Sequence, residues 1–231
     1  MIQNAKILEV FKSVQGEGKY LGAVQVFVRF FECNMHCVWC DTPGSIGDTT
    51  RNYKDVDLES LLNQIRPLYE GCHSVSITGG EPLLQADFLR IFLPKLQHEG
   101  MKVYLETNGV LPDALRQIIE WVDIIAMDIK LPSSTREKAF WDEHEDFLTS
   151  SLAKDVFIKM VITNDTSADD VYQAVDLVRR VNPHTLLIFQ PNFLDMKSGV
   201  VDKCQEYQQY AAKYLRDTRV IPQTHKYMKL R

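Results

Sequence analysis

The alternation of two kinds of apolar segment most restricts the fold of this chain. Short runs rich in valine, isoleucine and phenylalanine, which favour strands, alternate with longer segments whose apolar residues recur at helical spacing. The expected strands cover residues 5–11, 24–31, 74–78, 102–106, 123–128, 156–162, 186–189 and 219–221, and the expected helices cover 58–68, 85–98, 113–121, 168–181 and 200–215. Strands joined through helices are typical of βα units, so the sequence predicts an α/β fold with a parallel sheet, either open or a partial barrel.

The composition is that of an ordinary globular chain. Of its 231 residues, 45% are hydrophobic and 25% are charged, and no repeat or linker divides them. We therefore expect a single domain over residues 1–231, with a variable polar excursion at about 131–150. The formal net charge of −5 is unfavourable for wrapping a nucleic-acid backbone. Because the sequence contains neither a run of ~18 apolar residues nor a secretory signal, we expect no membrane span and a cytoplasmic location.

Polar and glycine-rich segments directly follow five of the expected strands. They cover residues 33–42, 79–82, 106–109, 128–130 and 190–193. In a parallel sheet the carboxyl ends of the strands share one rim, and functional loops leave the sheet there. The sequence therefore predicts one site at this rim.

Three cysteines, Cys33, Cys37 and Cys40, fall within eight residues. Three thiolates on one loop can bind a zinc ion that a histidine or Cys72 completes. They can equally bind a [4Fe–4S] cluster, which usually takes four thiolates. With only three thiolates, one iron would keep an open position for a substrate or cosubstrate. Cys72 and Cys204 lie on apolar patterns and are expected in the core.

A glycine-rich turn at residues 79–82, together with the cysteine spacing, favours an iron–sulfur cluster over a zinc ion. The spacing C-x3-C-x2-C, with Trp39 before the last cysteine, resembles the cluster loop of the radical S-adenosylmethionine (SAM) superfamily. The turn Gly79-Gly-Glu-Pro82, one βα unit later, resembles the Gly-Gly-Glu turn of the same superfamily. The resemblance implies a partial parallel β/α barrel, an open iron that chelates SAM, Trp39 near the adenine, and a turn backbone near the methionyl amino group. Glycine permits such a close backbone approach.

The start of the chain narrows the family. The segment Phe11-Lys-Ser-Val-Gln-Gly-Glu-Gly18 resembles the F-x-T-x-Q-G-E-G start of the 7-carboxy-7-deazaguanine synthases, with Ser13 in place of threonine. Further matching segments are 27–30, 40–42, 106–109 and 223–227, and Asp128-Ile-Lys130 stands where some members have Ser-Pro-Lys. The resemblance runs from about residue 11 to the end and is weakest at 131–150. It implies a radical ring contraction of 6-carboxy-5,6,7,8-tetrahydropterin to 7-carboxy-7-deazaguanine, with loss of ammonia and with Mg²⁺ bound.

The resemblance also implies roles for individual residues. It implies cluster ligands at Cys33, Cys37 and Cys40, a Mg²⁺ ligand at Thr42, SAM contacts at Trp39, Gly80, Glu81, Glu106, Asp128 and Lys130, and substrate contacts at Gln15, Gly16, Glu17, Arg29, Thr78, Gln190, Asn192 and His225. No catalytic residue is expected beyond the cluster and SAM, because the cofactor supplies the difficult chemistry.

Four of these residues have side-chain chemistry that suits the implied roles. Each of them could also have a purely structural role. Arg29 lies in an apolar strand, where a charge needs a partner. It therefore suits a bidentate clamp on the substrate carboxylate or a salt bridge to a protein carboxylate such as Glu32. Glu17 suits the donor edge of the pterin, or lies in a surface turn. Thr42 offers the oxygen ligand that Mg²⁺ prefers, or closes a turn. Glu106 suits the ribose hydroxyls of SAM, or caps a helix or forms an ion pair.

Two other functions compete with the synthase. A glycyl-radical-enzyme activase shares the cluster loop but usually begins with an Asp-Gly-Pro-Gly-like segment. A non-catalytic zinc-binding module would not need the other motifs on one rim. For the synthase we expect a small-molecule substrate, an electron donor such as flavodoxin or ferredoxin, no nucleic acid, no membrane, and, by analogy, a homodimer.

Overall fold

The computed structural model describes residues 4–47 and 52–230, so residues 1–3, 48–51 and 231 of the expected domain lie outside the described part. Its strands are β1 (Ala5–Val14), β2 (Val24–Phe30), β3 (Lys54–Val56), β4 (Ser74–Gly79), β5 (Val103–Thr107), β6 (Ile124–Asp128), β7 (Asp155–Ile162), β8 (Leu187–Pro191) and β9 (Thr218–Val220). Its helices are α1 (Leu58–Tyr69), α2 (Ala86–His98), α3 (Pro112–Ile118), α4 (Pro132–Thr135), α5 (Trp141–Ser151), α6 (Ala168–Val181), α7 (Val200–Ala211) and α8 (Thr224–Met228).

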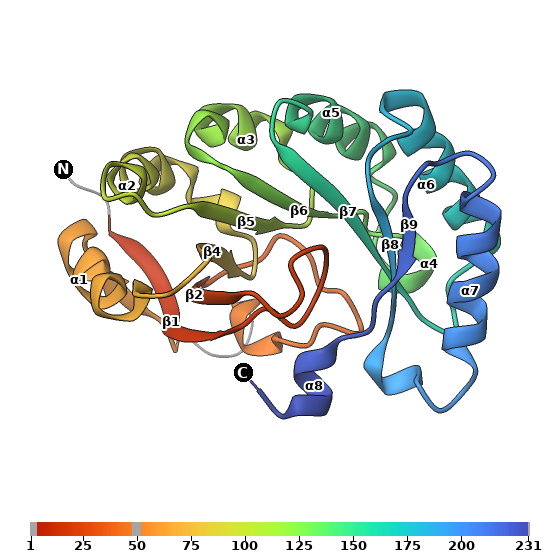
Figure 1. The fold of residues 1–231 in the computed structure, drawn as a ribbon, viewed down its shortest axis with the longest axis horizontal. Coiled ribbons are helices and arrows are strands. Elements are labelled where there is room, and N and C mark those ends of the chain that lie inside the picture. The colour runs from red at the N-terminus through yellow and green to blue at the C-terminus, as the bar shows by residue number, and fades with distance from the viewer. Residues whose placement is uncertain (1–3, 48–51, 231) are drawn as a thin grey trace.

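The strands within these ranges form one sheet, in the order β3-β1-β2-β4-β5-β6-β7-β8-β9. All neighbours from β2 to β9 pair in parallel, as the alternation predicts. The edge formed by β1 and β3 departs from this prediction, because β1 pairs antiparallel with both β2 and β3. The curved sheet leaves the barrel incomplete (Figure 1).

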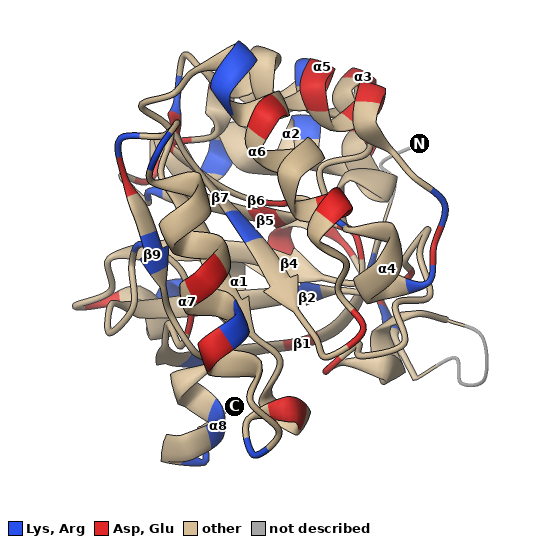
Figure 2. Ribbon diagram, turned by 90° about the vertical axis from the view of Figure 1, so that its right-hand side faces the viewer, with Lys and Arg blue, Asp and Glu red and all other residues tan. Residues whose placement is uncertain are grey.

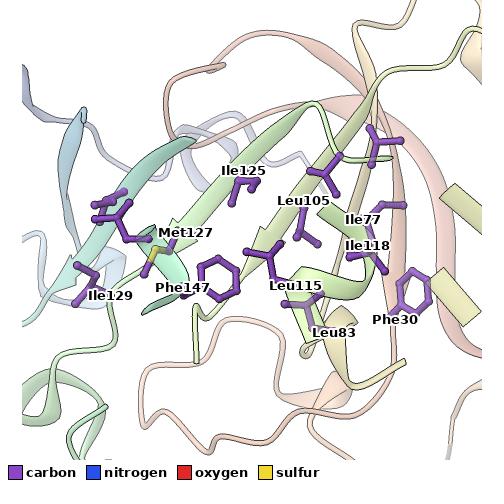
Figure 3. Packing of buried hydrophobic residues seen from close by; sticks show 14 of the residues in the cluster. Phe30, Ile77, Leu83, Leu105, Leu115, Ile118, Ile125, Met127, Ile129 and Phe147 are labelled. Atoms are coloured by element: carbon purple, nitrogen blue, oxygen red, sulfur yellow. The ribbon is translucent and has the colours of Figure 1, made fainter. Parts of the chain in front are cut away.

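Helices cover the outer face of the sheet. Figure 1 shows α2, α3, α5, α6 and α7 in an arc along one side of the sheet, with α8 on the opposite side. The core lies between the sheet and these helices, and Figure 3 shows part of it. In that part, Ile77, Leu105 and Ile125 from the strands meet Leu115 and Phe147 from the helices, and all five side chains are fully buried. Burying such side chains contributes roughly 1.5–3 kcal/mol each, so this layer holds the helices against the sheet.

The inner face of the sheet changes from apolar to charged along each central strand. Successive side chains of a strand point to opposite faces, so residues two apart share a face. A second buried apolar cluster includes Tyr104, Ile124 and Phe157. Two or four residues further along the same strands stand charged residues, namely Glu106 on β5, Asp128 on β6 and Lys159 on β7. The apolar cluster therefore forms the floor beneath a charged rim at the carboxyl ends.

The predicted elements differ from the observed ones mainly in short segments. The helix expected over 200–215 ends at Ala211, and the polar excursion contains α4 and α5. The short elements β3 and α8 are not predicted from the sequence. Cys204 is buried as expected, whereas Cys72 is half-buried in a turn before β4 and only packs against the edge of the core. Within the described ranges, no helix is both long enough and apolar enough to cross a membrane.

Candidate active site

A cavity opens at the carboxyl ends of the parallel strands. Its empty volume is about 1300 Å³ including the mouth. Its walls come from the loop after β1, the loop after β2, the ends of β4 to β8 and the segment before α8. The cavity therefore joins segments from both ends of the chain.

The three clustered cysteines all line this cavity. Cys33, Cys37 and Cys40 are partly buried, and all five cysteines of the chain are free. Burial raises the pKa of all three thiols, that of Cys33 to about 11. A metal that binds them must therefore displace protons.

Trp39 and Lys130 lie beside the cysteine loop. The Trp39 indole N–H donates a hydrogen bond to the Ser134 hydroxyl at 2.8 Å, and Lys130 Nζ lies 4.9 Å from the centre of the Trp39 ring. This cation–π geometry fixes the aromatic face at the cavity wall. Both predicted SAM contacts thus lie on the cysteine side of the cavity.

The glycine turn after β4 packs directly against the start of the cysteine loop. Gly79 has φ +135°, and a Cβ added at Gly80 would lie 2.1 Å from the Glu32 carbonyl oxygen. The Gly80 N–H donates to the Phe30 carbonyl at 3.1 Å, and the Glu81 N–H donates to the Glu32 carbonyl at 2.8 Å. Only glycine permits this approach of the turn to the loop that carries the cysteines.

Glu81 is predicted to contact SAM, but its side chain does not line the cavity. It is fully buried and accepts hydrogen bonds from the backbone N–H groups of Leu83 at 3.0 Å and Asn108 at 2.8 Å, and from the Thr107 hydroxyl. Burial raises the pKa of Glu81 to about 7, although these hydrogen bonds oppose the shift. The Glu81 side chain thus joins the glycine turn to the end of β5, and a contact of Glu81 with SAM stays a prediction.

We expect Glu81→Gln to lower the free energy of unfolding. The glutamine amide would face one of the two backbone N–H groups, and a buried donor left without an acceptor costs about 1–3 kcal/mol. Chemical denaturation of the protein without cofactors measures the loss. Glu206→Gln, on the exposed face of α7, is the matched control and should change little. Equal stability of the two variants would contradict the joining role.

A second carboxylate, Glu106, lines the cavity among predicted substrate residues. It accepts hydrogen bonds from the Gln15 amide at 2.8 Å, the Thr78 hydroxyl at 2.8 Å and the Ser76 hydroxyl at 3.2 Å. Gln15 also accepts from the Glu17 backbone N–H at 3.0 Å. Gln15 thus ties the loop after β1 to β5, which orders the backbone around Gly16 and Glu17.

Arg29 pairs with a carboxylate that the sequence does not single out. Its Nε donates to Glu9 Oε1 at 2.9 Å, and its Nη1 lies 3.4 Å from the Thr42 hydroxyl. Arg29 thus forms the salt bridge to a protein carboxylate that the sequence offers as an alternative, but with Glu9, because Glu32 pairs with Lys6 at 2.6 Å. Because Glu9 stands opposite Arg29 in the β1–β2 register, the pair is built by the antiparallel edge of the sheet. Arg29 and Thr42 both line the cavity.

Two residues at the end of β8 were predicted together, but the structure separates Gln190, within β8, from Asn192, which follows it. Gln190 lines the cavity and is buried, and its Oε1 has no hydrogen-bond partner among the residues that the structure describes. Asn192 does not line the cavity, because its side-chain amide donates to Asp195 at 2.9 Å. A buried acceptor without a partner is costly. Gln190 is thus suited to a ligand in the cavity, whereas the substrate contact expected of Asn192 stays a prediction.

Gln223 and the first residues of α8 close one side of the cavity. The Thr224 N–H donates to the Gly16 carbonyl at 2.9 Å, and the Gln223 amide donates to Glu17 at 2.8 Å and to Asp41 at 3.3 Å. The predicted residue His225 lies so close to Gly16 that an added Cβ would be 2.5 Å from its ring.

Asp41, Gln223 and Lys159 also line the cavity but are missed by the sequence predictions. Burial raises the pKa of Asp41. A hydrogen bond from His225 and the charges of Lys226 and Lys159 outweigh this effect, so the pKa lies below its usual range. Lys159 pairs with Glu17, and its signal in the sequence is a charge inside an apolar strand, the same signal that singles out Arg29.

The comparisons with known proteins identify the family. A sequence model of the radical SAM superfamily matches residues 28–192. The 7-carboxy-7-deazaguanine synthase of Geobacter sulfurreducens is 41% identical over 97% of this chain and 97% of its own length. That of Methanopyrus kandleri is 32% identical over 95% of this chain and 92% of its own. The chain belongs to the 7-carboxy-7-deazaguanine synthases, within the radical SAM superfamily.

A solved structure agrees at the level of the fold. The crystal structure of QueE from Escherichia coli matches with a TM-score of 0.65 over 95% of this chain and 94% of that chain, at 20% identity. The resemblance and the partial-barrel fold predicted from the sequence are thus confirmed, and the findings do not favour the activase or the zinc-binding module. Membership of the synthase family implies a [4Fe–4S] cluster and SAM as cofactors.

The donor set of the cavity fits both cofactors. Of the fourth zinc ligands considered from the sequence, His36 and Cys72 do not line the cavity. A distant histidine, His225, does line it, and its ring nitrogens face Glu17 at 3.9 Å and Asp41 at 3.7 Å. Three thiols face the cavity together. Three thiolates suit a cluster with one open iron. The backbone at Gly80, the face of Trp39 and the charges of Asp128 and Lys130 line the same cavity and suit a zwitterionic nucleoside cosubstrate.

Proposed function

We propose that this chain converts 6-carboxy-5,6,7,8-tetrahydropterin to 7-carboxy-7-deazaguanine, with loss of ammonia, in a pathway toward queuosine and related 7-deazapurines. One observation carries the proposal. The loop with Gln15 and Glu17, the strand with Arg29 and the orphaned Gln190 line the same cavity as the three cysteines. A cavity with a metal-ligating side and a polar, hydrogen-bonding side suits a small heteroaromatic acid held beside a cofactor.

The polar side of the cavity offers a partner for each edge of this substrate. A carboxylate such as Glu17 accepts from the pterin N3–H and 2-amino group, and the free oxygen of Gln190 accepts a further donor. The Arg29 guanidinium suits the substrate carboxylate. Thr42, whose hydroxyl lies 3.4 Å from Arg29 Nη1, offers an oxygen to Mg²⁺ at the same place. A hydrated Mg²⁺ that bridges Thr42 and the substrate carboxylate is therefore part of the proposal.

The protein binds and orients its ligands, and the cofactors supply the chemistry. When bound and reduced, the cluster and SAM supply the radical that a ring contraction needs. Cys33, Cys37 and Cys40 would hold the cluster, and Trp39, Gly80, Asp128 and Lys130 would hold SAM. The Glu106 carboxylate, which orders Gln15 and Thr78, keeps the two sides of the cavity in register and remains available to the ribose hydroxyls.

Two further features extend the proposal by analogy with the family alone, namely a flavodoxin or ferredoxin as electron donor and a homodimer. Two others, a single domain over residues 1–231 and a cytoplasmic location, rest on the sequence alone. All four stay predictions.

An anaerobic turnover assay tests the proposed function. The reconstituted protein, with reductant, SAM, Mg²⁺ and the pterin, should form 7-carboxy-7-deazaguanine, detected by mass spectrometry, and omission of any component should suppress it. Cleavage of SAM without this product would reject the substrate and keep the superfamily chemistry. A colourless, zinc-loaded protein would reject the cluster.

A further inference from the structure

A buried lysine joins the two sides of the cavity. Lys159 lies on β7 directly opposite Asp128 on β6, and both side chains face the cavity. Its Nζ contacts Glu17 Oε2 and lies 3.4 Å from Asp128 Oδ1. The side chains of Lys159, Asp128 and Glu17 are only 15%, 16% and 18% exposed, so water screens these charges little.

The contacts of Lys159 with Glu17 and Asp128 belong to a longer row in which positive and negative side chains alternate. The other oxygen of Asp128 accepts from Lys130 Nζ at 2.5 Å, and Lys130 reaches the Trp39 ring. The other oxygen of Glu17 accepts from Gln223 at 2.8 Å. The row Lys130–Asp128–Lys159–Glu17 thus crosses from the cysteine side to the polar side, and Figure 2 shows such charged segments on the central strands.

Because the Lys159 ammonium is shared by Asp128 and Glu17, the strength of its interaction with one carboxylate depends on its interaction with the other. Burial lowers the pKa of Lys159, but the negative charges of Asp128 and Glu17 outweigh burial and raise this pKa. The amine therefore stays protonated. A ligand carboxylate that pairs with Lys130 competes with Asp128 for that cation. Asp128 then relies more on Lys159, and Lys159 holds Glu17 less tightly. Glu17 is thereby freer to accept hydrogen bonds from a ligand on the polar side.

We propose that Lys159 is a positioning residue that couples the two halves of the cavity, so that SAM bound beside Asp128 and Lys130 tightens the binding of the pterin at Glu17. The inference rests on the proposed function for the identity of the two ligands. Coupling of this kind is reciprocal, and typical values change an affinity by about 5–150-fold. The row has one lysine between its two carboxylates, so removing Lys159 breaks the coupling at its centre.

Binding measurements without turnover test the coupling. Calorimetry on the anaerobic protein with its cluster oxidised gives the pterin affinity with and without SAM. We expect SAM to tighten pterin binding by at least about fivefold in the unchanged protein. In Lys159→Met this ratio should fall to about one, and Lys159→Arg, which keeps the charge, should restore part of it. Lys154→Met is the matched control, because that lysine only donates to a backbone carbonyl at the surface.

The outcomes separate this proposal from the function beneath it. If the unchanged protein binds SAM but not the pterin, the proposed function fails and the coupling fails with it. If the pterin binds but SAM does not tighten it, or if Lys159→Met keeps the full ratio, only the coupling is rejected. Lys159→Gln, which keeps a donor for one carboxylate, serves the same test should the methionine variant unfold. Thermal unfolding of each variant gives that check.

Discussion

Cys37→Ser is expected to leave a protein that folds but neither holds a full cluster nor turns over. The serine oxygen is a hard, protonated ligand, whereas iron in these clusters requires soft thiolates. The three cysteines act as one unit, and removing a member of a catalytic unit costs about as much as removing all of it, here at least ~10³ in turnover. Iron and sulfide content after anaerobic reconstitution, followed by the turnover assay, measures both effects.

Cys72→Ser provides the matched control for this loss. Cys72 lies in the turn before β4, outside the cavity, where its thiol donates to the Leu68 carbonyl at 3.3 Å. A serine hydroxyl can make the same hydrogen bond, so iron content and turnover should stay close to those of the unchanged protein. Loss of iron in Cys72→Ser, with full iron in Cys37→Ser, would contradict the ligand set.

Long elements with an apolar period were predictable from the sequence. The helix expected over 168–181 is α6 (Ala168–Val181), because Val171, Val175 and Val178 mark one buried face. Two short elements were not. Strand β3 has two exposed residues of three, and α8 has no buried residue, so neither carries an apolar pattern. Such elements form through contacts that the local sequence does not contain.

The antiparallel edge could not be predicted from the expected strands 5–11 and 24–31, because residues 12–23 between them are about long enough for a parallel crossover. In the structure β1 extends to Val14, so only residues 15–23 separate it from β2. This shorter connection requires a hairpin. This hairpin places Glu9 opposite Arg29 and turns the Gln15–Glu17 segment toward the cavity.

The sequence predicted which backbone segments form the site better than it predicted which side chains point into the cavity. Motifs located the cysteines, Gly80, Arg29 and Glu17, all of which line the cavity. Glu81 stands in such a motif, yet its side chain turns inward toward Asn108. Lys159 stands in no recognised motif and enters the cavity because β7 lies beside β6. Pairing between distant strands supplies this information, and a single sequence does not contain it.

Gly80→Ala is expected to disrupt both the fold around the cavity and the binding of SAM. The added methyl group would meet only backbone atoms, namely the Glu32 carbonyl oxygen at 2.1 Å, the Glu32 carbonyl carbon at 2.6 Å and the Ser45 carbonyl oxygen at 2.9 Å. Backbone cannot rotate aside as a flexible side chain can. The turn must therefore separate from the loop that carries Cys33, at a cost of about 1–3 kcal/mol or more. For a chain of this size, that corresponds to a fall of very roughly 2–12 °C in Tm.

Gly44→Ala is the matched control for this clash. Gly44 lies in the same loop region, but no described residue comes within 4 Å of an added Cβ there, and its φ is not positive. Differential scanning calorimetry should show a lower Tm for Gly80→Ala and an almost unchanged Tm for Gly44→Ala. Because the proposed SAM contact at Gly80 is made by the backbone, SAM affinity of the reconstituted Gly80→Ala protein should fall by at least ~10-fold, which corresponds to about 1.4 kcal/mol. Unchanged SAM affinity together with a lowered Tm would retain the packing role of Gly80 and reject its contact with SAM, since displacement of this backbone by the clash cannot leave a direct contact intact.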